Sequence, residues 1–158
     1  METTNTLPGR RIILFGQQNL QNSILIGFIH QRTNIDCQLV NQPQWREEWN
    51  TYPCKTLALI DAESARPENI QELLEAIYEQ PMDVMVAFFN TPPGHAMERM
   101  IVWPMVNGLF YRDSSQQQLS KGIQGMFSGE YWLPRQLMAQ YLERTRHKPR
   151  RMSAHAAL

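Results

Sequence analysis

The chain has 158 residues, of which 42% are hydrophobic and 19% charged, and its formal net charge is zero. A length of this order fits one globular domain, and the composition excludes a disordered, collagen-like or coiled-coil chain. No apolar run reaches the roughly 18 residues that a membrane span needs, and residues 1–10 lack the apolar stretch of a signal peptide. We therefore expect a cytoplasmic protein with no membrane partner.

Apolar runs and helical periodicities alternate along the chain. In chain order we expect a strand at 11–16, a helix at 19–31, strands at 36–40 and 56–61, a helix from 68–69 to before Pro81, a strand at 83–89, a helix at 95–102, a strand at 108–111, a helix from Ser114 or Ser115 to Gly129, and a helix at 134–146. Residues 41–53 are hard to assign, and their Trp45 and Trp49 are expected to cover the core. Strands that alternate with helices and are apolar on both faces predict a parallel sheet covered on both sides.

Charge is distributed unevenly along the chain. Residues 131–158 carry 6 of the 15 Lys and Arg residues but only 1 of the 15 Asp and Glu residues, Glu143. This carboxyl-terminal part is therefore the part of the chain that should attract an anion.

The sequence contains no pattern typical of an enzyme. The histidines at positions 30, 95, 147 and 155 match no metal-ligand or catalytic-triad spacing, and no glycine-rich phosphate loop is present. We therefore expect no enzymatic activity, no catalytic residue and no bound metal.

Four stretches of the sequence carry a resemblance to a known family. They are Leu-Ile-Asp at 59–61, Phe-Asn-Thr-Pro at 89–92, Trp-Pro-Met-Val-Asn-Gly-Leu-Phe-Tyr at 103–111 and Gly-Glu-Tyr-Trp-Leu-Pro-Arg at 129–135. Together they resemble the receiver domain of LuxR/FixJ-class transcriptional regulators, and most closely the CsgD/VpsT family of biofilm regulators. The resemblance implies an α/β fold of the flavodoxin or CheY kind: a doubly wound sheet of five parallel strands in the order 2-1-3-4-5, with an extra sixth helix at the carboxyl end.

The same resemblance implies how the chain is divided. Residues 1–10 would be a flexible leader, and residues 11–146 the receiver-like domain with its extension helix. Residues 147–158 would be a linker towards a helix-turn-helix domain that we expect to lie outside this chain. DNA would be contacted only through that domain, and the chain would be the regulatory part of a transcription factor.

In phosphorylated receivers, three groups cooperate around a strand-end aspartate. The aspartate accepts the phosphoryl group, an acidic pair after the first strand holds Mg²⁺, and a lysine after the fifth strand contacts the phosphoryl oxygens. The resemblance puts Asp61 at the acceptor position and Arg112 at the lysine position. Gln17, Gln18 and Asn19 occupy the place of the acidic pair, and neutral amides bind Mg²⁺ weakly. We therefore expect Asp61 to be a vestigial phosphoacceptor.

The segment Trp132-Leu133-Pro134-Arg135 looks like the W-[F/L/M]-[T/S]-R motif with which VpsT-like regulators bind cyclic di-GMP. An arginine can meet the O6 and N7 acceptors of guanine bidentately, and an indole can stack on a purine. Lys121, near the end of the preceding helix, would add positive charge. Pro134 departs from the motif, because proline has neither a hydroxyl nor an N–H to donate. If the last helix begins at Trp132 or just before it, Trp132 and Arg135 share one face.

The last expected helix carries a broad apolar stripe that includes Leu137, Met138, Tyr141 and Leu142. A receiver sheet can cover only part of an extension helix, so the uncovered stripe predicts an interface between two copies of the chain. In VpsT-like proteins an intercalated pair of cyclic di-GMP molecules joins two copies. The resemblance therefore implies a homodimer that the ligand favours.

Two other interpretations stay open. In the first, the domain is a ligand-independent dimerisation or protein-interaction module. Trp132 and Leu133 would then cap the core beneath the last helix, and Arg135 would be solvated. In the second, which we favour less, the domain is a receiver switched by phosphorylation of Asp61.

Overall fold

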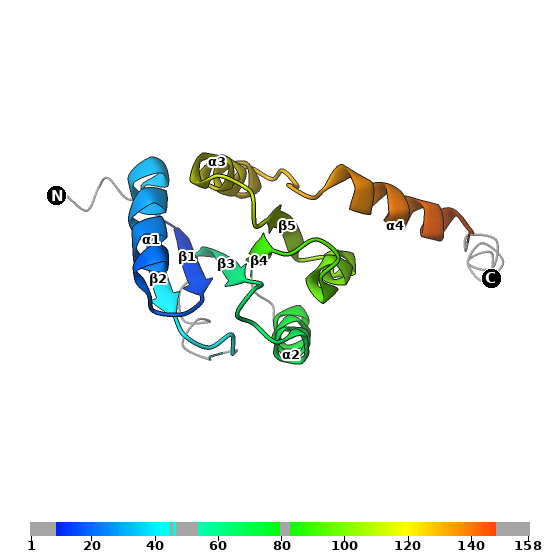
Figure 1. The fold of residues 1–158 in the computed structure, drawn as a ribbon, viewed down its shortest axis with the longest axis horizontal. Coiled ribbons are helices and arrows are strands. Elements are labelled where there is room, and N and C mark those ends of the chain that lie inside the picture. The colour runs from blue at the N-terminus through cyan, green and yellow to red at the C-terminus, as the bar shows by residue number, and fades with distance from the viewer. Residues whose placement is uncertain (1–8, 45, 47–53, 80–82, 148–158) are drawn as a thin grey trace.

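A computed structural model of the chain describes residues 9–44, 46, 54–79 and 83–147, with only the backbone described for residues 144–147. The strands are β1 (Arg10–Phe15), β2 (Asp36–Val40), β3 (Lys55–Asp61), β4 (Val84–Thr91) and β5 (Val106–Tyr111). The helices are α1 (Leu20–Thr33), α2 (Pro67–Tyr78), the 3₁₀ helix η3 (Ala96–Val102), α3 (Gln116–Phe127) and α4 (Arg135–His147) (Figure 1).

The strands form one sheet in the order β2-β1-β3-β4-β5, and all neighbouring strands are parallel. This confirms the predicted receiver-like fold and strand order. Because β3 is the central strand and ends at Asp61, the carboxyl end of the sheet carries this aspartate at its middle.

Helices cover both faces of the sheet, and the core therefore has two halves. Alternate β1 side chains point to opposite faces, as the period of a strand requires. Ile12 and Leu14 pack under α1 and α3, whereas Ile13 and Phe15 pack under α2 and η3 (Figure 1). The near-continuous apolar runs of the strands thus have the burial on both faces that a doubly wound sheet provides.

Local sequence explains where several helices begin. Asn19 caps α1 by accepting a hydrogen bond from the Asn22 N–H, and Pro67 occupies the first turn of α2. Ser115 caps α3 in a capping box, in which Gln118 bonds back to the Ser115 N–H. The prediction that Ser114 or Ser115 starts this helix is therefore confirmed at Ser115.

The apolar side chains of α1 are only partly buried. Leu25 and Ile29 belong to the core, but Leu20 is 75% and Ile24 is 52% exposed. The amino-terminal half of α1 therefore presents apolar side chains that no other described element covers.

Two further predictions need correction. The segment after His95 is a 3₁₀ helix rather than an α-helix. Within the described ranges, α4 is the fifth helix rather than the sixth, because no helix is described between β2 and β3. Trp45, Trp49, residues 1–8 of the expected leader 1–10 and residues 148–158 of the expected linker lie outside the described residues. No helix in the described part is both long and apolar enough to cross a membrane.

Candidate functional site

Asp61 lies at the carboxyl end of β3, in register with Phe89 of β4. Its side chain is 8% exposed, and its Oδ1 accepts hydrogen bonds from the Glu63 N–H at 3.0 Å and the Asn90 Nδ2 at 3.3 Å. Burial raises the pKa of Asp61 above its ordinary value, and these two hydrogen bonds oppose the rise.

The residues that replace the acidic pair do not form a cation site. Gln17 and Gln18 are exposed, and the side-chain oxygen of Asn19 is used as the cap of α1. Asn22, which is 5% exposed, donates its Nδ2 to the Gln17 carbonyl at 2.8 Å. Across the described ranges, no group of three or more His, Cys, Asp or Glu side chains is placed to hold a metal ion.

Arg112 lies at the end of β5, at the place of the receiver lysine, but its nearest acidic partner is Glu63. The Arg112 Nη1 is 3.9 Å from the Glu63 Oε2, and both side chains are 53% exposed. Glu63 also accepts a hydrogen bond from Asn90 at 3.0 Å. The cation opposite Asp61 is thus engaged by a neighbouring carboxylate, and the sequence did not signal this role of Glu63.

The Trp132–Arg135 segment is extended before it becomes helical. The Trp132 N–H donates to the Asn107 carbonyl at 2.8 Å, and the Leu109 N–H donates to the Trp132 carbonyl at 2.9 Å. Trp132 thereby forms a parallel bridge with Gly108 and continues the sheet beyond β5. The edge of β5 is covered at this point.

The Trp132 indole is packed against α3. Its ring is stacked on Phe110, with 6.4 Å between the ring centroids and 21° between the planes. It also lies over Gly122 and Gly125, where an added Cβ would collide with aromatic atoms. The indole Nε1 donates to the Glu130 carboxylate at 3.1 Å. Ring position and ring orientation are therefore both fixed, while part of the side chain stays exposed.

The condition under which Trp132 and Arg135 would share a helical face is not met, because α4 begins only at Arg135. The Met138 N–H donates to the Pro134 carbonyl at 3.1 Å, so Pro134 stands just before the helix and closes its first turn. Leu133 is partly buried against the α2–η3 half of the core, and Trp132 against the other half. The two neighbouring side chains thus straddle the edge of the sheet.

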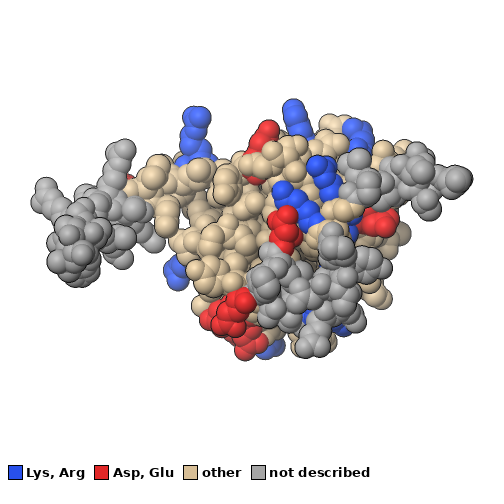
Figure 2. Space-filling view, turned by 180° about the vertical axis from the view of Figure 1, so that it is seen from behind, with Lys and Arg blue, Asp and Glu red and all other residues tan. Residues whose placement is uncertain are grey.

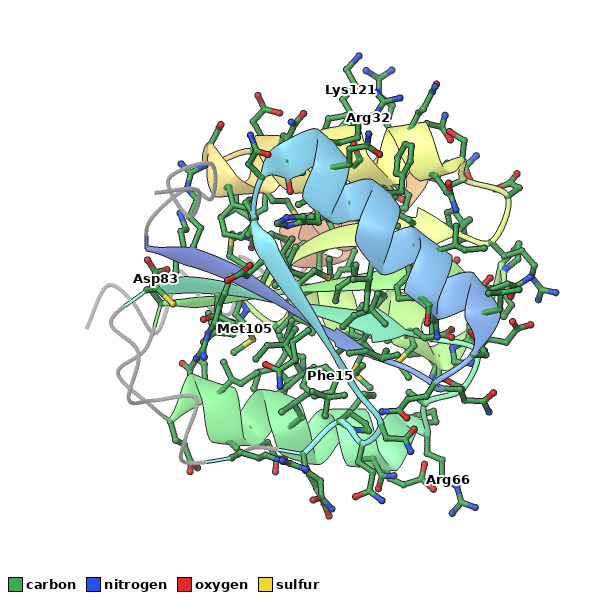
Figure 3. All side chains as sticks on the ribbon, turned by 90° about the vertical axis from the view of Figure 1, so that its left-hand side faces the viewer. Phe15, Arg32, Arg66, Asp83, Met105 and Lys121 are labelled. Carbon is green, nitrogen blue, oxygen red and sulfur yellow. The ribbon has the colours of Figure 1, made fainter. Side chains whose placement is uncertain are left out.

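Lys121, the weaker candidate for the ligand site, is exposed on α3. Figure 3 shows Lys121 beside Arg32 of α1 at one edge of the molecule. Gln124, one turn later in α3, donates a hydrogen bond to the Arg32 carbonyl at 3.0 Å. The structure gives no contact between Lys121 and the Trp132–Arg135 segment.

The helix α4 projects from the domain (Figure 1). Of the four predicted interface residues, Leu137 packs against the core, whereas Met138, Tyr141 and Leu142 are 42%, 46% and 55% exposed. Helical spacing puts Arg135, Met138 and Leu142 on one face, at positions i, i+3 and i+7. The candidate ligand-binding arginine and the exposed apolar side chains therefore lie along the same side of α4.

The Trp132 ring lies in a notch formed by Gly122 and Gly125 of α3. We therefore expect a single methyl group added at this notch to destabilise the domain. Gly125→Ala places a Cβ against the indole nitrogen and the Glu130 carboxylate, so the ring must leave its position. We expect a loss of about 1–3 kcal/mol of stability from this overpacking, together with a shifted Trp132 indole N–H resonance. Gly27→Ala is the control, because Gly27 lies within α1 with nothing near its Cβ, and it should raise stability by up to about 1 kcal/mol. If Gly125→Ala and Gly27→Ala unfold at the same temperature, Trp132 is not packed against Gly125.

A comparison with protein families identifies this arrangement. The family model described as the VpsT-like receiver domain matches residues 14–135, from within β1 to the first residue of α4. The chain belongs to the VpsT-like receiver family. The family match includes both the Asp61 pocket and the whole Trp132–Arg135 segment.

Curated relatives of this VpsT-like receiver are longer than the chain itself. The CsgBAC operon transcriptional regulatory protein of Escherichia coli K12 is 23% identical over 138 residues, which are 87% of this chain and 62% of that protein. The probable csgAB operon transcriptional regulatory protein of Salmonella typhimurium LT2 is 25% identical over 134 residues, or 85% of this chain and 60% of that protein. The chain thus spans about three fifths of the length of these relatives.

A solved structure shares the fold of the VpsT-like receiver. The crystal structure of the regulatory domain of the master biofilm regulator CsgD matches with a TM-score of 0.71 at 22% identity, over 84% of this chain and 98% of that one. At this identity the match establishes the receiver fold.

Sequence reasoning missed the residues that hold Trp132 in place: Phe110, Gly122, Gly125 and Glu130. The available signal was the pair Gly122 and Gly125, three residues apart in an otherwise good helix. Glycine inside a helix costs stability, and a close approach by another group is one reason for its presence.

Proposed function

We propose that this domain is the regulatory receiver of a biofilm-type transcription regulator, that it binds cyclic di-GMP at Trp132–Arg135, and that the ligand favours pairing of two copies through α4. One observation carries the proposal. The Trp132 indole is held in place by its surroundings, and three residues later the exposed Arg135 begins the projecting helix α4. Both curated relatives are described as transcriptional regulatory proteins, and this supports the role in transcription.

The chemistry of the segment suits a guanine nucleotide. A ring that is already held in place loses little conformational freedom when a base stacks on its open side, and stacking is worth about 1–3 kcal/mol per base. Arg135 offers the planar fork that meets guanine O6 and N7. Pro134 cannot supply the hydroxyl of the family motif, so contacts to the phosphates must come from other groups.

The charge distribution also favours an anion at this end of the molecule. The acidic side chains Glu68, Glu72 and Glu75 lie on α2, and Figure 2 shows an acidic group gathered along the lower edge of the molecule, where Figure 1 places α2. The junction of α3 and α4 lies on the opposite side (Figure 1). A ligand with two phosphates is therefore attracted to the side away from α2.

Ligand and pairing are linked by the geometry of α4. Arg135 shares its face with Met138 and Leu142, so a two-fold pairing along that face with the two helices parallel brings two Arg135 side chains near each other. Two like charges oppose such a pairing, and an anionic ligand between them removes the repulsion. A ligand that binds the paired state better than the single chain shifts the equilibrium towards the pair.

The second candidate is a ligand-independent interaction module. Its support is the packing of Trp132 and Leu133 against the two halves of the core, because this packing by itself accounts for both apolar side chains. The two candidates make different predictions for the free protein. Only the module dimerises equally well with and without nucleotide.

Calorimetric titration with cyclic di-GMP, paired with sedimentation of the same samples, tests the proposal. We expect saturable heat and a larger sedimentation coefficient on addition of the nucleotide. Self-association that is unchanged by nucleotide, without binding heat, would support the ligand-independent module. In the full-length protein, contact with DNA through a helix-turn-helix domain and a cytoplasmic location are part of the same proposal.

Phosphorylation of Asp61 is expected to be absent or irrelevant. The amides after β1 provide no carboxylate for Mg²⁺, and Arg112, at the place of the receiver lysine, is engaged by Glu63. Incubation with acetyl phosphate and Mg²⁺ should therefore add no acid-labile mass in a mass spectrum. A stoichiometric mass increase that disappears in Asp61→Asn would instead establish a working phosphoacceptor.

A further inference from the structure

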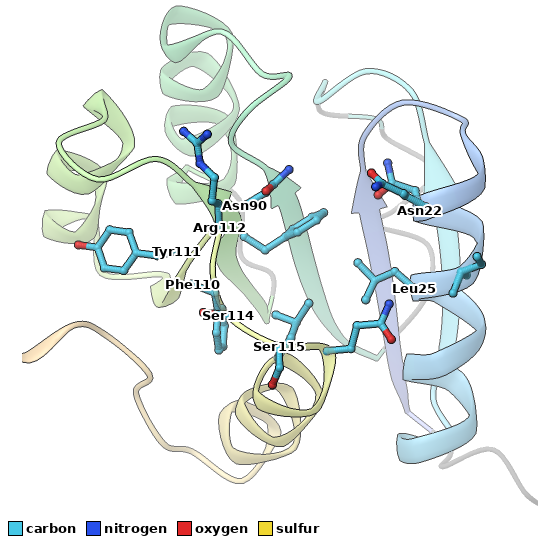
Figure 4. A pocket seen from close by; sticks show the side chains of 13 residues that line it. Asn22, Leu25, Asn90, Phe110, Tyr111, Arg112, Ser114 and Ser115 are labelled. Carbon is cyan, nitrogen blue, oxygen red and sulfur yellow. The ribbon is translucent and has the colours of Figure 1, made fainter.

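A cavity of about 270 Å³ separates the amino-terminal halves of α1 and α3, at the carboxyl end of the sheet. The two helices are joined further along, where the Gln124 side chain bonds to the Arg32 carbonyl, and they splay apart at their starts. In Figure 4, α1 with Asn22 and Leu25 stands opposite the β5–α3 connection with Ser114 and Ser115. We call this cavity the α1–α3 cleft.

The floor of the α1–α3 cleft is apolar and its rim is polar. The floor consists of Leu25, Phe89, Phe110 and Leu119, which are 7%, 7%, 6% and 5% exposed. Ile24 adds an apolar wall that is 52% exposed. An apolar floor against which a ring can lie, with polar groups that fix its orientation, is a form that small-molecule sites take.

The charges and dipoles at the polar rim favour an anion. The side chains around the cleft are carboxamides, hydroxyls, one guanidinium and no carboxylate, namely Gln21, Asn22, Asn90, Arg112, Ser114, Ser115 and Gln116. The Tyr111 hydroxyl donates to Glu98 at 2.6 Å and points away from the cleft. The first turns of α1 and α3 also contain no acidic residue. The helix dipoles and Arg112 therefore act together, and both favour an anion over a cation at the rim.

Arg112 and Asn90 connect the cleft to the Asp61 pocket. Both belong to the rim of the cleft, and both contact Glu63, Arg112 at 3.9 Å and Asn90 at 3.0 Å. An anion in the cleft therefore competes with Glu63 for Arg112.

We propose that the α1–α3 cleft binds a small aromatic carboxylate, with its ring on the apolar floor and its carboxylate at Arg112 and the rim hydroxyls. This site is separate from the Trp132–Arg135 segment, which lies beyond the other edge of β5 and lines no part of the cleft. Phe110 lies in the floor of the cleft and also stacks on Trp132, but the two proposals use different probes and different variants, so each can fail without the other.

The test uses 2-naphthoate as the probe and the methyl NMR spectrum of the chain labelled at Ile and Leu. We expect shifts of the Ile24, Leu25 and Leu119 methyl groups that saturate with a Kd of about 0.1–1 mM, as the ligand efficiency of a small fragment allows. The neutral analogue 2-naphthalenemethanol should bind about fivefold more weakly, and Arg112→Gln should weaken 2-naphthoate by a similar factor.

A matched pair of α1 variants separates contact from long-range charge. Ile24→Asp puts a carboxylate on the wall of the cleft and should weaken 2-naphthoate at least tenfold, roughly the effect of one like charge at close range. Leu20→Asp puts the same charge one turn earlier, at a residue that is 75% exposed and outside the cleft, and should weaken it much less. Both positions are exposed, so both variants should fold.

Three results would each overturn the proposal. The first is the absence of methyl shifts at about 5 mM 2-naphthoate, well above the expected range. The second is equal binding of the neutral analogue, which would show an apolar hollow without preference for an anion. The third is an equal loss of affinity in Ile24→Asp and Leu20→Asp, which would show that the probe binds outside the cleft.

Discussion

Leu142→Glu should convert the ligand-loaded dimer into a monomer without unfolding the domain. Leu142 is 55% exposed on α4, so the substitution leaves the core intact. In a two-fold pair it acts twice, because each copy contributes the same face. Losing the burial of a leucine costs about 1.5–3 kcal/mol, so two losses weaken the dimer roughly 100-fold to 10,000-fold, before the cost of the buried charges is added.

Gln136→Glu is the control for this experiment. It adds the same charge to α4, but helical spacing puts Gln136 on the side away from Met138 and Leu142. Sedimentation equilibrium with cyclic di-GMP should report a dimer for Gln136→Glu and a monomer for Leu142→Glu, with the same circular dichroism for both. If Leu142→Glu dimerises like the parent chain, the interface lies elsewhere on the molecule.

The fold was predictable because its signals are local and repeated. The second strand was expected at 36–40 and is Asp36–Val40, and the helix expected from Ser114 or Ser115 is α3, which begins after the cap Ser115. Strands buried on both faces need contiguous apolar runs, and helices between them need a 3.6-residue period. Both patterns are contained in short stretches of sequence, so each strand and helix could be recognised by itself.

The candidate site depended on contacts that no local pattern encodes. Trp132 was expected just before the helix at 134–146, and no local pattern indicates its pairing with Gly108 at the sheet edge, because this pairing joins residues far apart in the chain. The exposure of Leu20 and Ile24 likewise follows from the splaying of α1 and α3, which periodicity along α1 cannot reveal. A hydrophobic stripe shows which residues face inward only when the partner element covers the whole stripe.

Arg135→Ala should weaken cyclic di-GMP binding about tenfold to more than a hundredfold. The substitution removes the bidentate partner of guanine, which is worth about 1–3 kcal/mol. Arg135 is exposed at the first position of α4, so its removal should leave stability unchanged. Arg66→Ala is the matched control, because Arg66 is also exposed and lies at the opposite end of the molecule from Lys121 (Figure 3).

Variants of Trp132 must be interpreted together with their stability. Trp132→Ala should weaken binding as much as Arg135→Ala, but it also removes the indole from the notch of Gly122 and Gly125, so part of its effect is lost packing. Trp132→Phe keeps a ring in the notch, although it loses the hydrogen bond to Glu130, and its affinity should fall between those of the parent and Trp132→Ala. Binding should also weaken with salt, because the ligand carries two phosphates.

Comparing the stability, nucleotide affinity and self-association of the variants distinguishes the two candidate functions better than any single affinity does. If the segment only packs against the core, stability falls with Trp132→Ala, while Arg135→Ala changes neither stability nor self-association. If the segment binds the nucleotide, Arg135→Ala lowers affinity and ligand-dependent association together, at constant stability. An Arg135→Ala chain that titrates and sediments like the parent at high micromolar cyclic di-GMP would leave the ligand-independent module as the function of the segment.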